Sequence, residues 1–204
     1  RSSDLLLLLI ADGDFWNKYF NLLFYLIFTI IFVAFYKKNL IRMLKDIKNN
    51  IDRYTTYSLV CLFVILILMI GSAILLSQFS IGDSANQQEV DKALEEYRII
   101  TALVTCLFGP FVEEIVFRGI IYGTLRRILR NRVGIFIAIS ITALIFGLYH
   151  CDLVYILNGE YEQILTCIPL CFVGFGLSFL YEKTKNIFCP IAVHLIINFI
   201  ATFG

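Results

Sequence analysis

The chain has 204 residues, of which 59% are hydrophobic and only 16% carry a charged side chain. An average soluble domain has about 25% charged residues, and a water-soluble fold of this size could not bury so much apolar surface. A soluble enzyme, a disordered chain and, at a net charge of +1, a nucleic-acid-binding protein are therefore excluded. The composition predicts an all-α, polytopic membrane helical bundle with about six to seven transmembrane helices.

The apolar segments can be followed in chain order. A first one at 5–11 is ended by Asp12 and Asp14 before it reaches the length that a bilayer requires. Residues 80–97 are polar and acidic and predict a loop with a short surface helix. Within the long segment 98–129, Gly109-Pro110 is expected to divide the chain into two helices. The expected spans are 15–36, 54–78, 98–129, 133–150, 161–180 and 187–203.

Charge predicts the orientation. Six basic residues lie between 37 and 53, four between 126 and 132, and two at 183 and 185. With six crossings, all three clusters fall on one side of the membrane. By the positive-inside rule these loops are cytoplasmic and both termini lie outside.

The six cysteines lie inside apolar runs or near their ends, and no two of them form a CxxC motif. We therefore expect them to be small apolar packing residues and not a disulfide framework.

Three short stretches place ionisable or strongly polar side chains in the spans: EEIVFR at 113–118, FGLYH at 146–150 and HLIIN at 194–198. An ionisable side chain at the bilayer centre costs roughly 2.5–3.5 kcal/mol, so these groups must face one another or a wet cavity. Glu114 and Arg118 are four residues apart, which predicts an ion pair on one helical face. Glu113, about 100° round the helix, is left to point elsewhere.

Both histidines of the chain lie in these stretches. A single membrane histidine is often an interhelical hydrogen-bonding residue, but two of them with a Glu pair and Asn198 favour a shared polar site. Three chemistries fit. In the first, Glu113 activates a water molecule with the help of a histidine. In the second, His150, His194 and Glu113 bind zinc, although the sequence lacks an HExxH motif. In the third, Cys151 is a nucleophile beside His150, although adjacent residues of a helix point about 100° apart.

The three stretches together resemble the CAAX protease and bacteriocin-processing (CPBP, or Abi) family of intramembrane glutamic endopeptidases, whose hallmarks are EExxxR, FxxxH and HxxxN/D in this order. The match covers residues 110–199 and all three hallmarks are complete. The resemblance implies that residues 98–204 are the catalytic core. Residues 1–97, with two transmembrane helices, are then an N-terminal region for substrate or partner specificity.

The resemblance also implies residue roles. The first glutamate is the general base that activates water, assisted by the first histidine, and no metal or other cofactor takes part. The last histidine and the asparagine stabilise the oxyanion, and the second glutamate and the arginine support the site. The implied catalytic residues are thus Glu113, His150, His194 and Asn198, supported by Glu114, Arg118 and Phe146.

The implied activity is hydrolysis of a peptide bond in a small peptide or membrane-tethered protein, such as a leader, signalling or bacteriocin-type peptide. The implied location is a bacterial cell membrane, with the site facing the cytoplasm; nothing indicates the oligomeric state. Two alternatives stay open: a non-catalytic immunity or scaffold protein that binds a peptide or partner, and a small transporter with a proton relay. If the spans are straight, His150 lies near the outer end of its helix and His194 lies nearer the inner end of its own. A shared site therefore requires 186–190 to dip inward, or a topology shifted by one segment.

Overall fold

The computed structural model describes residues 13–204 except 80, 83, 152–156 and 160, so the apolar segment at 5–11 lies outside the described residues. The described residues are mostly helical and include no strand, which confirms the all-α prediction. Its α-helices are α2 (Gly13–Asn49), α3 (Ile51–Ser77), α4 (Ala85–Leu103), α5 (Gly109–Glu114), α6 (Gly123–Ile128), α7 (Arg132–Tyr149), α9 (Ile168–Thr184) and α10 (Phe188–Phe203). Two π-helical segments, η1 (Val104–Phe108) and η2 (Ile115–Tyr122), and a 3-10 helix, η3 (Tyr161–Cys167), complete them.

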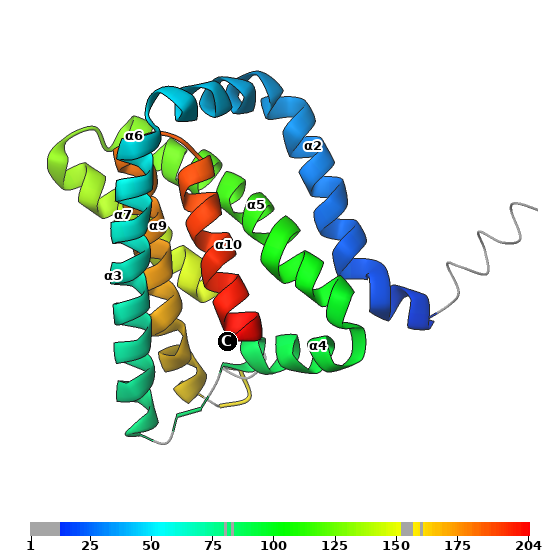
Figure 1. Cartoon of the computed structure of the whole chain (residues 1–204). Helices are drawn as coiled ribbons and strands as arrows, with labels where there is room; N and C mark the ends of the chain where they lie inside the picture. Colours follow the sequence, from blue (N-terminus) through cyan, green and yellow to red (C-terminus); the bar gives the residue numbers. More distant parts are fainter. Residues whose placement is uncertain (1–12, 80, 83, 152–156, 160) are drawn as a thin grey trace, which may run out of the picture.

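The helices form the expected membrane bundle (Figure 1). Among the described residues, five helical stretches are long and apolar enough to cross a bilayer, and the shorter α10 is apolar as well. The five are Lys18–Asn49, Ile51–Ser77, Asn86–Ile128, Arg132–Tyr149 and Ile164–Thr184. The chain is therefore an integral membrane protein.

Helix α2 is longer than the sequence predicted, because it continues through the basic segment that was expected to be a loop. Its 37 residues extend about 55 Å at ~1.5 Å per residue, well beyond the ~30 Å hydrocarbon core. The last part of α2 bends across one end of the bundle (Figure 1). There it covers the connection between α9 and α10, where the Asn186 side chain donates a 2.8 Å hydrogen bond to the Met43 carbonyl.

The expected division of the chain at Gly109-Pro110 is wrong. A continuous helical path runs from Asn86 to Ile128, and its kink lies earlier, at Tyr97, with φ −134° and ψ 51°. At the proline the helix widens instead of ending: the Gly109 N–H donates to the Val104 carbonyl, five residues back. This π-turn accommodates Pro110, which has no N–H to donate. A Cβ on Gly109 would lie 2.8 Å from the Val104 oxygen, so the turn requires glycine.

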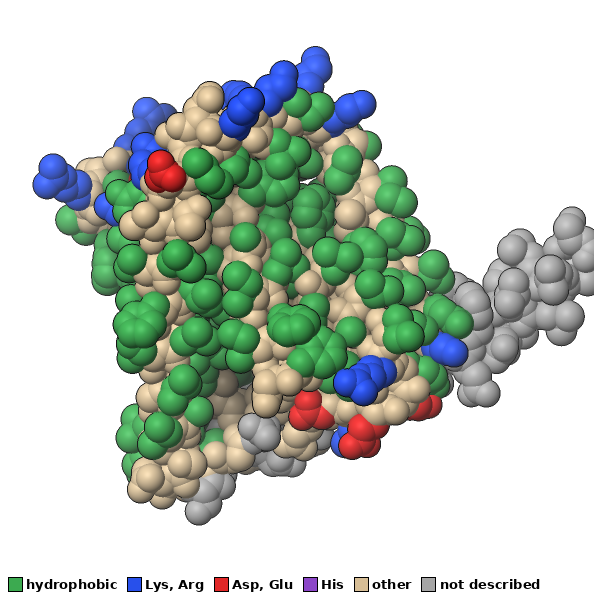
Figure 2. Space-filling view, viewed as in Figure 1, with side chains coloured by type: hydrophobic (Ala, Val, Ile, Leu, Met, Phe, Trp, Pro, Cys, Tyr) green, Lys and Arg blue, Asp and Glu red, His purple; other side chains and the backbone are tan. Residues whose placement is uncertain are grey.

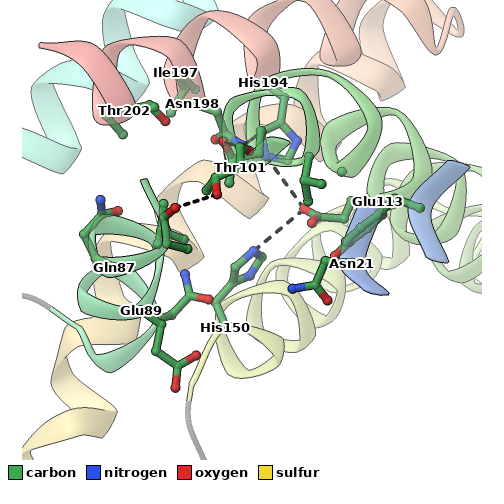
Figure 3. Close-up of a pocket in the computed structure, with 18 of the residues that line it drawn as sticks. Asn21, Gln87, Glu89, Thr101, Glu113, His150, His194, Ile197, Asn198 and Thr202 are labelled. Carbon is green, nitrogen blue, oxygen red and sulfur yellow. Dashed lines mark hydrogen bonds and ion pairs between the residues drawn. The ribbon is translucent and has the colours of Figure 1, made fainter. Parts of the chain in front are cut away.

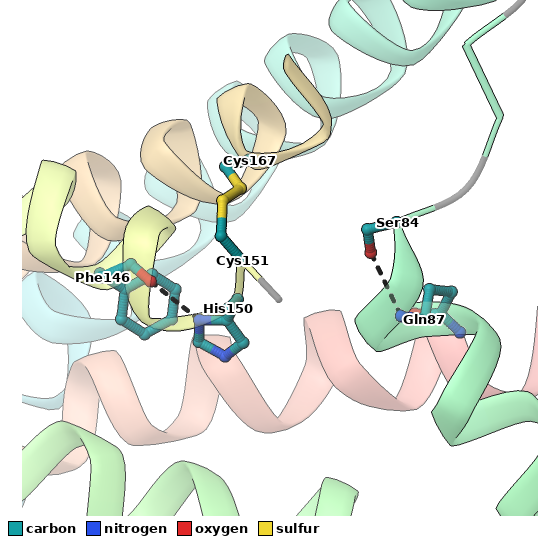
Figure 4. The surroundings of a disulfide bond; sticks show 6 residues. All are labelled: Ser84, Gln87, Phe146, His150, Cys151 and Cys167. Carbon is teal, nitrogen blue, oxygen red and sulfur yellow. Dashed lines mark hydrogen bonds between the residues drawn. A yellow bond between two sulfur atoms is a disulfide. The ribbon is translucent and has the colours of Figure 1, made fainter. Parts of the chain in front are cut away.

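Cys151 and Cys167 form a disulfide that joins the end of α7 to the start of α9 (Figure 4). The expectation that the cysteines only pack is therefore wrong for this pair. The other four are free. The two Cα atoms lie 6.1 Å apart, within the usual range for a disulfide. The spacing of the cysteines in the sequence could not show that the end of α7 and the start of α9 lie this close together.

The two ends of the bundle differ in charge. Lys and Arg side chains gather at one end, which carries the last part of α2, the connection from α6 to α7 and the connection from α9 to α10 (Figure 2). We call this the basic end. The opposite end carries the start of α2, helix α4 and the ends of α7 and α10, and we call it the α4 end (Figure 1).

Candidate active site

The three polar stretches meet in one cavity of about 500 Å³. Glu113 comes from α5, His150 from the end of α7 and His194 from α10 (Figure 3). The Nε2 atoms of His150 and His194 lie 3.7 and 3.8 Å from the same atom, Glu113 Oε2. The shared polar site that the sequence favoured is present, and Asn198 and Phe146 line the same cavity.

A buried start of α10 explains how the two histidines reach one depth. Asn186 and Ile187, which precede α10, are 0% and 4% exposed and lie beneath the last part of α2. The start of α10 is therefore covered by protein. Running from there toward the α4 end, the helix places His194 opposite the last residue of α7.

Glu114 and Arg118 form the predicted ion pair, and both side chains are 0% exposed. Arg118 Nη1 donates to Glu114 Oε1 at 2.7 Å, and Nη2 donates to the Gly174 carbonyl of α9 at 3.0 Å. The same carboxylate oxygen lies 2.8 Å from His194 Nδ1. The ion pair thus joins α5 and η2 to α9 and α10 around the site, and it orients His194 while Glu113 faces the cavity.

Removing the charge of Glu114 should destabilise the fold. Glu114→Gln leaves the Arg118 guanidinium buried without a counter-charge, which costs about 3–5 kcal/mol for a fully buried pair. The free energy of unfolding, measured by titration with a denaturing detergent, should fall by this order. Glu89→Gln, on an exposed position of α4, is the matched control and should leave that free energy unchanged. An unchanged stability of Glu114→Gln would show that the pair does not hold the site together.

The hydrogen bond at Nδ1 defines the tautomer of His150. Its Nδ1 lies 2.9 Å from the Phe146 carbonyl, which can only accept, so Nδ1 carries the hydrogen. In the neutral ring Nε2 is then a bare acceptor that faces Glu113. Nδ1 of His194 lies beside the Glu114 carboxylate, which accepts its hydrogen, and Nε2 of His194 also faces Glu113.

Phe146 packs between the catalytic candidates. It is 1% exposed, and its ring centroid lies 4.6 Å from that of His150 and 5.7 Å from that of His194. The Arg118 guanidinium lies 4.8 Å from the same centroid, within the range of a cation–π contact. Phe146 therefore shapes the pocket.

Asn198 is anchored on the π-helical segment η1. Its Nδ2 donates a 2.8 Å hydrogen bond to the Thr105 carbonyl. In a regular α-helix the Gly109 N–H would bond to that oxygen, but the π-turn sends it to Val104 instead. The bulge at Gly109-Pro110 thus frees an acceptor for Asn198, and the second amide hydrogen of Asn198 stays available to the cavity.

Part of the cavity wall comes from the N-terminal region, and sequence reasoning missed it. The Tyr25 hydroxyl of α2 lies 3.5 Å from the Tyr149 hydroxyl of α7. The polar residues of α2 and α4 in this wall are Lys18, Asn21, Asn86, Gln87 and Glu89. The only signal for the α4 residues was the polarity of 80–97, and Lys18 and Asn21 lie within the expected span 15–36.

Within the described residues, no group of three or more His, Cys, Asp or Glu side chains is arranged as a metal site. Cys151 is bonded to Cys167, so it holds no free thiol for the nucleophilic alternative.

Comparison with known proteins agrees with the motifs. The family described as Type II CAAX prenyl endopeptidase Rce1-like matches residues 95–200. A Bacillus subtilis (strain 168) protein named "Putative membrane peptidase YdiL" is 35% identical over 121 residues, which are 59% of this chain and 43% of that protein. "Membrane-embedded CAAX protease MroQ" of Staphylococcus aureus (strain USA300) is 28% identical over 166 residues, 79% of this chain and 62% of that protein.

The chain thus spans less than two thirds of the length of these curated relatives, and no solved structure matches it significantly. The family match nevertheless covers more than half of the chain and includes all three polar stretches. The chain belongs to the Type II CAAX prenyl endopeptidase Rce1-like family of membrane proteases.

Proposed function

We propose that this protein is an intramembrane endopeptidase that hydrolyses a peptide bond in a small peptide or a membrane-tethered protein. One observation carries the proposal. Glu113 Oε2 is buried, accepts no hydrogen bond from the described residues and faces both Nε2 atoms across a gap of less than 4 Å. A carboxylate held in this way is ready to accept a proton from a water molecule in the cavity.

The mechanism follows from the acceptors and donors around Glu113. The carboxylate takes one proton of the water, and His150 Nε2 orients the water as a second acceptor. The water oxygen then bonds to the substrate carbonyl carbon, whose oxygen becomes the oxyanion. His194, doubly protonated with Nδ1–H held by Glu114, donates from Nε2, and Asn198 donates its second amide hydrogen. Glu113 finally returns the proton to the leaving amine, which breaks the C–N bond.

The N-terminal region supplies substrate specificity in this proposal. Residues 1–97 contribute α2 and most of α4, whose polar side chains line the cavity together with the catalytic groups. A peptide that reaches Glu113 must therefore pass this wall. Leader, signalling and bacteriocin-type peptides are the proposed substrate class, in a bacterial cell membrane.

The test is hydrolysis in water labelled with oxygen-18. The purified protein in liposomes is given two probes, a farnesylated CAAX peptide and an unprenylated hydrophobic leader-type peptide, and the products are weighed by mass spectrometry. Direct hydrolysis places one labelled oxygen in the new carboxylate of whichever peptide is cut. Cleavage should survive strong chelation, because the proposed base is a carboxylate and not a metal-bound hydroxide.

Two results would contradict the proposal. Zinc that copurifies in stoichiometric amount, is lost together with activity and restores it on re-addition would favour a His₂Glu metalloprotease. Tight binding of a peptide without any cleavage, also at long incubation, would favour the non-catalytic immunity or scaffold protein.

A further inference from the structure

We propose that the Cys151–Cys167 disulfide is a positioning element for His150, and that the active site opens at the membrane face exposed to an oxidising compartment. The catalytic part of this inference rests on the proposed function. The part on membrane orientation does not, and it can be tested without a substrate.

The disulfide lies directly beside a catalytic candidate (Figure 4). Cys151 follows His150, which caps the last turn of α7, and Cys167 immediately precedes α9. The ends of helices fray, and here the last bonds are short-range ones, from the His150 N–H to the Gly147 carbonyl and from the Cys151 N–H to the Leu148 carbonyl. The covalent link holds this turn on α9.

The helix that receives the link is itself closely packed against α7. A Cβ at Gly147 would lie 2.2 Å from Cys171 Sγ, and one at Gly174 would lie 3.0 Å from Ala143 Cα. The α9 backbone is thus a rigid support at this point, and Arg118 also binds to it through the Gly174 carbonyl. A disulfide to α9 therefore restricts how far His150 Nε2 can move from Glu113.

Two independent features give the orientation. The cavity reaches α4 and the first turns of α2, so it lies toward the α4 end, and the disulfide lies at that end as well. Structural disulfides persist in the periplasm and at cell surfaces and are rare in the cytosol. The basic end lies opposite, and basic loops remain cytoplasmic. Both features place the α4 end outside the cytoplasm.

This result separates two expectations from the sequence. Cytoplasmic basic loops and a cytoplasm-facing site cannot both hold when the site lies toward the opposite end. Of the two expectations, the disulfide favours the cytoplasmic location of the basic loops. Its formation removes two electrons and two protons from the thiols, and a thiol–disulfide oxidant of the extracytoplasmic space accepts them.

The catalytic part is tested by reducing the wild-type protein with dithiothreitol, well below its melting temperature. Turnover per folded molecule should fall by about 10- to 100-fold, as expected for a misplaced catalytic group, with KM little changed, and reoxidation should restore it. Cys151→Ser should be slow from the start and insensitive to the reductant. Cys171→Ser, a free cysteine one turn further along α9, should behave as the wild type. Turnover of the reduced wild type within twofold of the oxidised protein would overturn the positioning role.

The orientation is tested in intact cells with a membrane-impermeant maleimide. The wild type should be labelled more strongly after treatment with an impermeant phosphine reductant, and the Cys151→Ser, Cys167→Ser double variant should show no such increase. An increase that appears only after the membrane is permeabilised would place the site in the cytoplasm. Labelling of both thiols without any reductant would show that the disulfide does not form. Neither outcome depends on proteolysis, so failure here is distinguishable from failure of the proposed function.

Discussion

Glu113→Gln is expected to lower turnover by about 10²–10⁴-fold, the contribution of a positioned general base. The substitution keeps the volume and a hydrogen-bonding side chain, but an amide cannot take the proton of water. Glu113 lies outside the Glu114–Arg118 pair, so the melting temperature should change little. Turnover per folded molecule, measured with the peptide that the wild type cleaves, decides the result.

The cavity offers a matched control for this experiment. Glu89 lines the same cavity from α4, and its side chain is exposed (Figure 3). Glu89→Gln removes the same charge from the same cavity and should keep kcat within a few-fold, while KM for the peptide can change. If Glu113→Gln also stays within a few-fold of the wild type, Glu113 is not the base. Equal losses in both variants would point to the charge of the cavity and not to proton transfer.

Contacts within one helix were predictable from the sequence. The spacing of four residues placed Glu114 beside Arg118 and left Glu113 on another face, and both features are present in the structure. Helical geometry fixes such neighbours without reference to the rest of the fold. The cost of isolated charges in a bilayer also predicted that the polar stretches face a common cavity.

Contacts between helices were not predictable in the same way. The convergence of His150 and His194 depends on a buried start of α10 beneath α2, and no local spacing reports that arrangement. The disulfide likewise depends on how α9 packs against α7. The proline rule failed at Pro110 because a π-turn, possible only with glycine before it, removes the clash that usually ends a helix.

Asn198→Ala carries the second large expected effect, and it tests whether the third motif is catalytic. If the second amide hydrogen of Asn198 binds the oxyanion, its loss should lower kcat by about 10²–10³-fold, or roughly 2.7–4 kcal/mol of barrier. KM should change little, because this bond is made mainly in the transition state. Asn21→Ala, on an exposed position of α2 that lines the same cavity, is the control and should keep kcat near the wild-type value.

The bond from Asn198 to the Thr105 carbonyl offers a rival explanation that the same variant can exclude. If Asn198 only joins α10 to η1, its loss should cost about 0.6 kcal/mol of stability, the average for such bonds in a membrane protein, and the folded molecules should turn over normally. Asn198→Asp refines the distinction, since an aspartate replaces the amide donor only when it is protonated. Normal turnover per folded molecule in both Asn198→Ala and His194→Ala would remove the oxyanion role and favour the scaffold alternative. A loss of turnover without a matching loss of stability would instead assign Asn198 to the transition state, with Thr105 as the anchor that aims it.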